Sequence, residues 1–231
     1  MPATPDPNRT SGTTLPSWFA TAAPPPTFAP LAANITADVV VIGAGIAGLT
    51  TAYLLGKEGQ RVVVLEDGEI ASGESGRTTA HLSNALDDRY TTLEQLFGQE
   101  GARLAAESHS AAIDQIEKIV ADERLGCDFT RLAGYLFLPQ NGNPQELHDE
   151  LAAAHRAGLR DVEYLPDSDT TGFRTGPCLR FPNQGQFHIL KYLSGLAQAI
   201  RRRAGASSRT RTWRRRRAAV RLKPLLPRAL R

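Results

Sequence analysis

One stretch of this chain strongly limits the folds open to it, because an apolar run, three spaced glycines and a helical pattern follow one another directly. The run Val39–Ile42 is apolar throughout, as in a parallel strand buried on both faces, and Ile46–Lys57 carries apolar side chains at helical spacing. Gly43, Gly45 and Gly48 therefore fall on a strand-to-helix turn. We predict that this stretch forms the first βαβ unit of an α/β domain.

The glycine turn also predicts a ligand. Its first glycine permits the tight turn, its second lets the backbone approach a pyrophosphate, and its third lets the helix pack closely on the strand. Unpaired N–H groups and the positive end of the helix dipole then face the phosphates. We therefore expect the turn to bind a dinucleotide through Gly43, Ala44, Gly45, Ile46 and Gly48.

A second strand, Val62–Leu65, ends at Glu66, which stands 23 positions beyond Gly43. A carboxylate there can accept hydrogen bonds from both adenosine ribose hydroxyls and repels a 2′-phosphate. We include the neighbouring Asp67 as a candidate ligand. Two alternatives stay open: a glycine-rich turn without any ligand, and a membrane span over 39–56, against which the glycines and the return strand argue.

The stretch Ala71–Ser83 is too polar and too rich in glycine for a core strand. Its arginine, Arg77, can offset phosphate charge, and its hydroxyl groups can donate to phosphate oxygens. The alternative is a solvated loop with a capping serine or threonine.

Taken together, these motifs resemble the D-amino-acid oxidase-like superfamily of FAD-dependent oxidoreductases. The resemblance rests on Ala37–Leu49, Val64–Glu66, Ser72–Ser83, Gly134–Pro139 and Gly176–Pro182. It is closest to the bacterial branch whose full-length members often carry a C-terminal Rieske iron–sulfur domain.

The resemblance implies that FAD is the cofactor, with its ADP half on the glycine turn and Glu66. It also implies that the pyrophosphate and flavin lie along Arg77, Thr78, Thr79, Ala80 and His81. For His81, a hydrogen bond to flavin, proton transfer, covalent attachment and simple packing at a helix start all stay open. Neither a catalytic acid or base nor a metal-ligand set is predicted.

The rest of the pattern predicts an inserted α+β unit. We expect helices at 93–125 and 145–156, strands at 129–138 and 162–165, and a hairpin from 179 that leads into a helix ending at Arg203. The predicted fold class is thus α/β, a Rossmann-like FAD-binding βαβ domain over 37–205 with part of an inserted substrate domain. Arg180 and His188 are candidates for substrate contact, with a solvated or a capping role as the alternative. Tyr135 and Phe137 either line a cavity or pack in the core.

The two ends differ from this middle part. Residues 1–36 form a proline-rich lead, which is either pinned to the domain by Trp18 and Phe19 or disordered. Residues 206–231 hold nine arginines and Lys223 without any acidic residue, which leaves 17 basic against 24 acidic groups in the first 205. We expect a non-native or disordered tail. We also hypothesise a shifted reading frame, because plausible GC-rich codons for the start of this tail, when read two bases later, encode a sequence that alternates as in a strand.

We therefore expect a FAD-dependent oxidoreductase that moves a hydride from a carbon bearing an amine or hydroxyl to flavin N5. The resemblance implies a small amine or amino acid as substrate. The family's late glycine-rich segment and the Rieske Cys-x-His and Cys-x-x-His pairs are absent, which predicts an N-terminal fragment. The alternatives are an NAD-dependent dehydrogenase and an inactive or basic-tailed binding protein; neither nucleic acid nor a membrane is the expected partner. Two isolated cysteines, Cys127 and Cys178, fit the cytoplasm.

Overall fold

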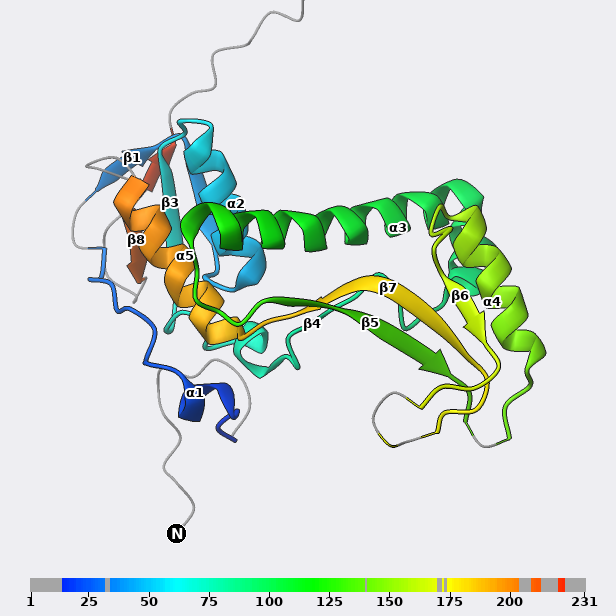
Figure 1. Ribbon diagram of the computed structural model, residues 1–231. Helices are drawn as coiled ribbons and strands as arrows, with labels where there is room; N and C mark the ends of the chain where they lie inside the picture. The colour runs from blue at the N-terminus through cyan, green and yellow to red at the C-terminus, as the bar shows by residue number, and fades with distance from the viewer. Residues whose placement is uncertain are drawn as a thin grey trace, which may run out of the picture. The chain divides into compact units, whose positions relative to one another are not determined.

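The computed structural model describes residues 14–31, 34–139, 141–169, 172, 174–203, 209–212 and 220–222 (Figure 1). The chain divides into two compact units. The first unit comprises Met1–Thr79, Glu123–Cys127 and His188–Arg231, and the second comprises Ala80–Asp122 and Asp128–Phe187. Along the sequence, the second unit is therefore inserted into the first.

A parallel three-stranded sheet in the order β2-β3-β8 forms the centre of the first unit. Its strands are β2 (Val39–Ile42), β3 (Val62–Glu66) and β8 (Arg209–Thr212). Val39 pairs with Val62 and Ile42 with Leu65, without a register shift. The helix α2 (Ile46–Lys57) connects β2 to β3, which confirms the predicted βαβ unit.

Helices complete the core of the first unit. The helix α5 (Ile189–Arg203) packs against α2, whose buried side chains are those of Leu49, Ala52 and Tyr53. The remaining elements are α1 (Trp18–Thr21), the short 3-10 helix η1 (Glu74–Arg77) and the parallel pair β1 (Ile35–Ala37) and β9 (Val220–Leu222). The predicted basic tail thus contributes two short strands, β8 and β9; its other residues lie outside the described part of the chain.

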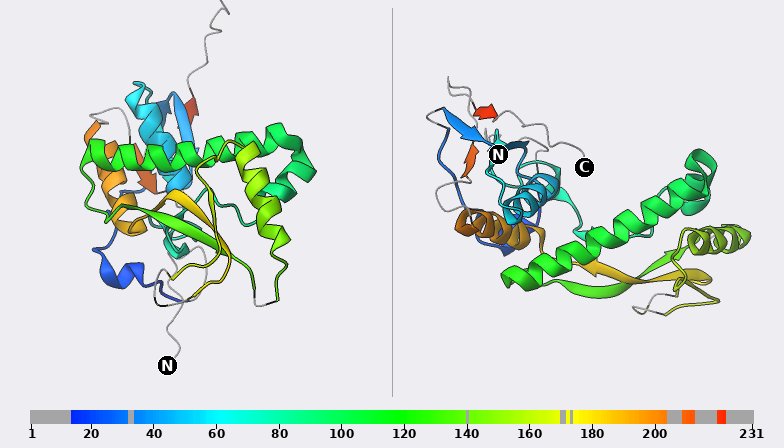
Figure 2. Two further views of the ribbon diagram at one scale, coloured as in Figure 1. Left: turned by 45° about the vertical axis from the view of Figure 1, so that its right-hand side comes forward. Right: turned by 90° about the horizontal axis from the view of Figure 1, so that it is seen from above.

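The second unit is built around one long strand, β7 (Cys178–Gln186), which pairs antiparallel with three others. These are β4 (His81–Leu82), β5 (Thr130–Phe137) and β6 (Glu163–Leu165). The helix α3 (Tyr90–Glu123) runs along this sheet, where Ile113 approaches Gly185 (Figure 2). With α4 (Gln145–Arg156), it covers a core that includes Tyr90, Leu147 and Phe181.

The predicted hairpin after residue 179 is wrong. β7 continues through Pro182 and Asn183, although this pair resembles a turn signal. Asn183 has a φ of 63°, and β7 carries one more residue than β5 between the pairs Gly134–Phe181 and Leu132–Gln184. The sequence signal therefore marks a β-bulge, which bends a strand without reversing it.

The alternative of a membrane span over 39–56 is also wrong, because β2 and α2 divide this stretch. No helix within the described ranges combines the length and the apolar character needed to cross a membrane.

Candidate functional site

The glycine turn joins the carboxyl end of β2 to the amino end of α2. Gly43 has a φ of 99°, a backbone conformation that other residues rarely adopt, and its N–H donates to the carbonyl oxygen of Leu65 at 2.7 Å. A Cβ on Gly48 would collide with the carbonyl oxygen of Gly43. Strand and helix can therefore approach this closely only with glycine at both positions.

A serine outside the glycine turn forms a hydrogen bond at the point where the turn enters α2. The Ser75 hydroxyl accepts a hydrogen bond from the Ile46 N–H at 3.0 Å, and a Cβ on Gly45 would lie 2.8 Å from the same oxygen. η1 consequently packs directly against the first turn of α2. Ser75 is not among the predicted ligands, because nothing in the sequence distinguishes it from the other hydroxyl residues of its stretch.

Glu66 faces the same turn from the end of β3. Its Oε2 accepts the Ala44 N–H at 2.6 Å, and its Oε1 accepts the Gly68 N–H at 3.0 Å. Two carboxylate oxygens have about four acceptor positions, so capacity for further donors remains. The neighbouring Asp67 is exposed.

Arg77 supplies the positive charge of this region. Its terminal nitrogen donates to the Thr14 carbonyl oxygen at 3.2 Å, whereas its buried Nε has no hydrogen-bond partner among the described residues. A buried N–H without a partner costs about 1–3 kcal/mol, a cost that an acceptor such as a phosphate oxygen would remove. The donor set therefore fits an anionic ligand.

The backbone on either side of Arg77 is strained. Ala71 and Ala80 have φ values of 63° and 59° although neither is glycine, and both side chains are buried. Such strain is typical of ligand-binding segments held by their surroundings. A Cβ on Gly76 would also collide with the Ala71 carbonyl oxygen, so the stretch 72–79 is closely folded on itself.

A family model described as DAO, FAD dependent oxidoreductase, matches residues 38–220. The chain belongs to this DAO family. This family depends on FAD, which confirms the predicted cofactor. The alternative of an NAD-dependent dehydrogenase is therefore wrong.

Two relatives of this chain are similar to it over most of its length. The Rieske 2Fe-2S iron-sulfur protein YhfW of Bacillus subtilis is 34% identical over 191 residues, covering 82% of this chain and 37% of YhfW. Gamma-glutamylputrescine oxidoreductase of Escherichia coli is 29% identical over 177 residues, covering 74% of this chain and 41% of its own length. The chain thus spans about two fifths of each relative.

Two solved structures share the fold at low sequence identity. L-amino acid deaminase from Proteus myxofaciens has a TM-score of 0.60 and 15% identity, covering 83% of this chain and 40% of its own. Glycine oxidase from Geobacillus kaustophilus has a TM-score of 0.59 and 16% identity, and the match covers 77% of this chain and 47% of the oxidase. This confirms the predicted α/β fold class of a DAO protein.

The last residues of the predicted DAO cofactor stretch have different surroundings. Thr78 and Thr79 are exposed residues of the first unit, whereas Ala80 and His81 belong to the second. His81 lies in β4, paired with Gln186, and its side chain is exposed. The alternative of a histidine packed at a helix start is therefore wrong.

The candidates for substrate contact have structural roles. Arg180 forms an ion pair with Glu163 at 3.2 Å. His188 is buried directly before α5, where its Nδ1 accepts the Lys191 N–H in a long bond of 3.4 Å. This confirms the capping interpretation of His188. Phe137 is 44% exposed, so it does not belong to the core of the second unit.

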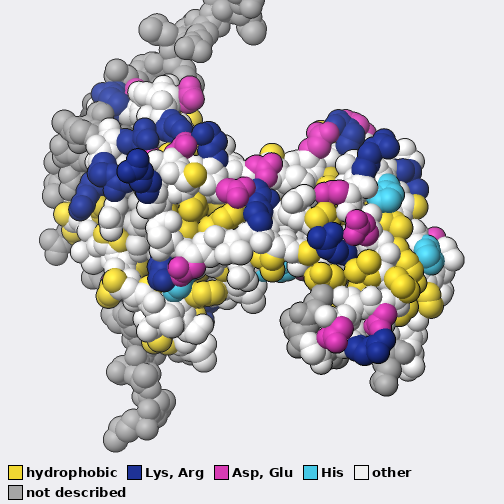
Figure 3. All heavy atoms as spheres, viewed as in Figure 1, with side chains coloured by type: hydrophobic (Ala, Val, Ile, Leu, Met, Phe, Trp, Pro, Cys, Tyr) yellow, Lys and Arg dark blue, Asp and Glu magenta, His cyan; other side chains and the backbone are white. Residues whose placement is uncertain are grey.

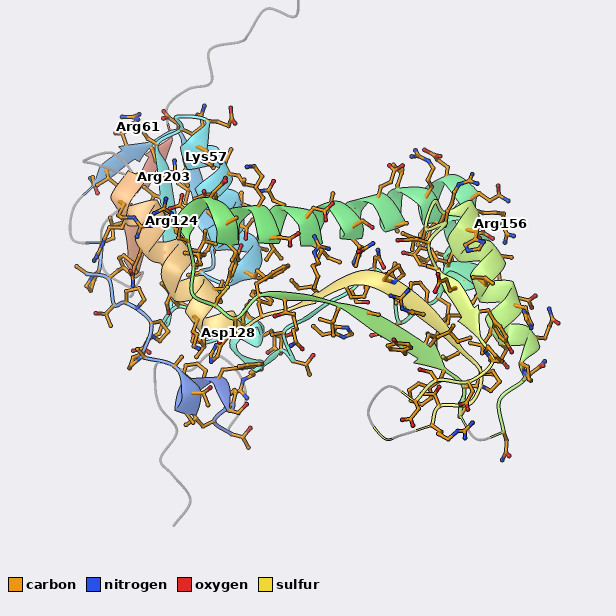
Figure 4. The ribbon with its side chains drawn as sticks, viewed as in Figure 1. Lys57, Arg61, Arg124, Asp128, Arg156 and Arg203 are labelled. Carbon is orange, nitrogen blue, oxygen red and sulfur yellow. The ribbon has the colours of Figure 1, made fainter. Side chains whose placement is uncertain are left out.

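Basic side chains gather over the carboxyl ends of α2 and α5 in the first unit (Figures 3 and 4). Arg203 and Arg202 form ion pairs with Glu123, which also accepts a hydrogen bond from the Tyr53 hydroxyl at 2.8 Å. Burial by itself would raise the pKa of Glu123, but the hydrogen bonds from Tyr53 and both arginines outweigh it and hold the pKa below its ordinary value. This cluster connects three helical segments and complements the negative helix ends.

Proposed function

We propose that this chain is the FAD-binding N-terminal part of an enzyme that oxidises a small amine or amino acid. Bound FAD would supply the hydride acceptor, flavin N5, for a substrate carbon that bears an amine or hydroxyl group. The single observation that carries the proposal is that the first unit holds the glycine turn with Glu66 bonded to it and Arg77, whose buried Nε has no partner among the described residues. The names of the E. coli relative and of the two solved structures support an amine substrate.

The proposed role of each residue follows from its donors and acceptors. Gly45 lets the backbone approach the pyrophosphate, and Gly48 lets α2 pack closely on β2. The Ile46 N–H is bonded to Ser75, so the N–H groups that follow it in the first turn of α2 would face the pyrophosphate. Glu66 exchanges part of its present backbone bonding for the ribose hydroxyls, and Arg77 donates its Nε–H to a phosphate oxygen. The full proposed set of cofactor-binding residues is Gly43, Ala44, Gly45, Ile46, Gly48, Glu66, Asp67, Arg77, Thr78, Thr79, Ala80 and His81.

A cytoplasmic location is proposed as well. Both cysteines, Cys127 and Cys178, are buried, and neither forms a disulfide bond within the described part of the chain. Cysteines outside disulfide bonds are the usual state in a reducing compartment, which supports this location.

The test is a titration of the purified chain with FAD, followed by the absorption band near 450 nm and by flavin fluorescence. We expect saturable binding, and about fivefold to tenfold weaker binding for Glu66→Gln, since a ribose hydroxyl bonds less strongly to an amide than to a carboxylate. Glu69→Gln is the matched control, because Glu69 is exposed in the same loop. A chain that never binds FAD contradicts the proposal, and equal affinities of the two variants contradict the role of Glu66.

A further inference from the structure

The segment that precedes the cofactor domain contacts the stretch proposed to bind the cofactor. Residues 14–21, which include α1, contact the last two residues of η1, Gly76 and Arg77, and the residue that follows them, Thr78. The Trp18 indole N–H donates to the Thr78 carbonyl oxygen at 2.8 Å, and the Thr14 carbonyl oxygen accepts from Arg77 at 3.2 Å. A Cβ on Gly76 would lie 3.3 Å from the ring of Phe19. These contacts confirm that Trp18 and Phe19 pin the lead to the domain.

The same segment is tied to α5 on its other side. The Thr21 hydroxyl donates within its own helix to the Ser17 carbonyl oxygen at 3.0 Å, so its oxygen accepts from His188 Nε2 at 3.1 Å. The Trp18 and His188 rings meet edge to face at 4.9 Å. The proton of His188 is thereby assigned to Nε2, and Nδ1 accepts from the Lys191 N–H in the first turn of α5.

We propose that residues 14–21 form a clamp on the cofactor segment and that Trp18 is a positioning residue for FAD binding. The inference rests on the proposed function, in which Arg77 and Thr78 lie along the cofactor. Trp18 fixes the backbone at Thr78, and Thr14 fixes the guanidinium so that its unpaired Nε–H keeps one direction.

The physical reason for the clamp is preorganisation. An arginine side chain loses much rotamer freedom when it is ordered, and a ligand that finds it already ordered binds more tightly. The strained backbones of Ala71 and Ala80 persist only where neighbouring contacts hold them. The bonds from residues 14–21 hold Arg77 and Thr78, which lie between these two alanines in the sequence.

Trp18→Phe tests the clamp, because it keeps an aromatic ring against His188 and removes the N–H donor to Thr78 together with part of the indole ring. We expect the FAD dissociation constant to rise about fivefold to tenfold, the size expected for one lost hydrogen bond. The shape of the bound-flavin band near 450 nm should change as well. In the FAD-free protein, the backbone amides of residues 76–79 should exchange with deuterium several times faster.

Tyr90→Phe is the matched control, since it also removes an aromatic donor to a backbone carbonyl, that of Asn84 at 2.6 Å, within the second unit. It should lower the melting temperature without changing the FAD dissociation constant. Thr21→Val provides a second route, because it loosens the bond of α1 to His188 without touching residues 76–78, and it should act in the same direction as Trp18→Phe.

The outcomes separate the two proposals. Wild-type FAD affinity and wild-type amide exchange in both Trp18→Phe and Thr21→Val would overturn the clamp while FAD binding stands. A wild-type chain that binds no FAD would overturn the cofactor assignment and the positioning role together. Weaker FAD binding with faster exchange at 76–79, and no such change in Tyr90→Phe, would support both.

Discussion

Arg77 offers the sharpest test at the scale of a single residue, because its Nε–H is buried and has no partner in the part of the chain that the structure describes. Arg77→Lys keeps the charge but removes the planar fork of donors, so we expect about tenfold weaker FAD binding, or about 1.4 kcal/mol. Arg180→Lys is the control, since Arg180 is paired with Glu163 in the second unit. Fluorescence titrations of both variants check this expectation, and an unchanged affinity for Arg77→Lys would rule out the proposed phosphate contact.

Two glycines of α2 provide a matched pair for stability. Gly48→Ala places a Cβ against the Gly43 carbonyl oxygen, and we expect the free energy of unfolding to fall by about 2 kcal/mol or more. Gly56→Ala adds its Cβ to open space in the same helix and should raise that free energy by about 0.5–1 kcal/mol. Urea denaturation of the two variants measures both effects; a loss of the same size in each would show that the close approach at Gly48 is not the cause.

At the scale of elements, Glu123 connects the end of α3 to α2 and α5 through Tyr53, Arg202 and Arg203. Its pKa in the folded chain lies below the ordinary 4.5, so its stabilising effect is present above that pH and is lost as pH falls through the folded value. We expect Glu123→Gln to lower the free energy of unfolding at pH 7 by about 1–2 kcal/mol and to reduce its pH dependence below pH 5.

Thermal unfolding at pH 7, 5 and 4 measures this effect. Glu100→Gln is the control, because Glu100 forms an exposed ion pair with Arg103, and such pairs stabilise little. A wild-type pH profile for Glu123→Gln would show that Glu123 has no such role.

The elements also show what sequence can predict. The βαβ unit and α4 follow from local periodicity, and their predicted limits agree with the structure. The start of α3 does not, because its first N–H groups, on Tyr90 and Thr91, are capped by the buried carboxylate of Glu150 from another helix. The bulge at Asn183 and the hydrogen bond from the Ile46 N–H to Ser75 likewise depend on partners far away in sequence. For the same reason the motifs predicted the glycine turn and Glu66 but not Ser75, and they predicted that Trp18 contacts the domain but not that its partner is Thr78.

At the scale of the whole molecule, FAD should stabilise the chain by mass action. Free FAD at about 100 times its dissociation constant should add about 2.7 kcal/mol to the free energy of unfolding. Hydrogen exchange with and without FAD measures where this happens, and we expect added protection at residues 43–48 and 75–78. Protection confined to the second unit would contradict the proposed site. The reading-frame hypothesis for the tail stays a prediction, which sequencing of the gene tests.

The interleaving of the two units has a consequence for proteolysis and for protein engineering. The chain passes between them four times, and the short return Glu123–Cys127 is held at both ends, by Arg203 on Glu123 and by the His188 N–H on the Cys127 carbonyl. A protease nick at one crossing, such as 127–128, gives two fragments that each carry parts of both units. Such fragments should stay associated after cleavage, and transplanting the second unit into another flavoprotein requires two grafted segments rather than one.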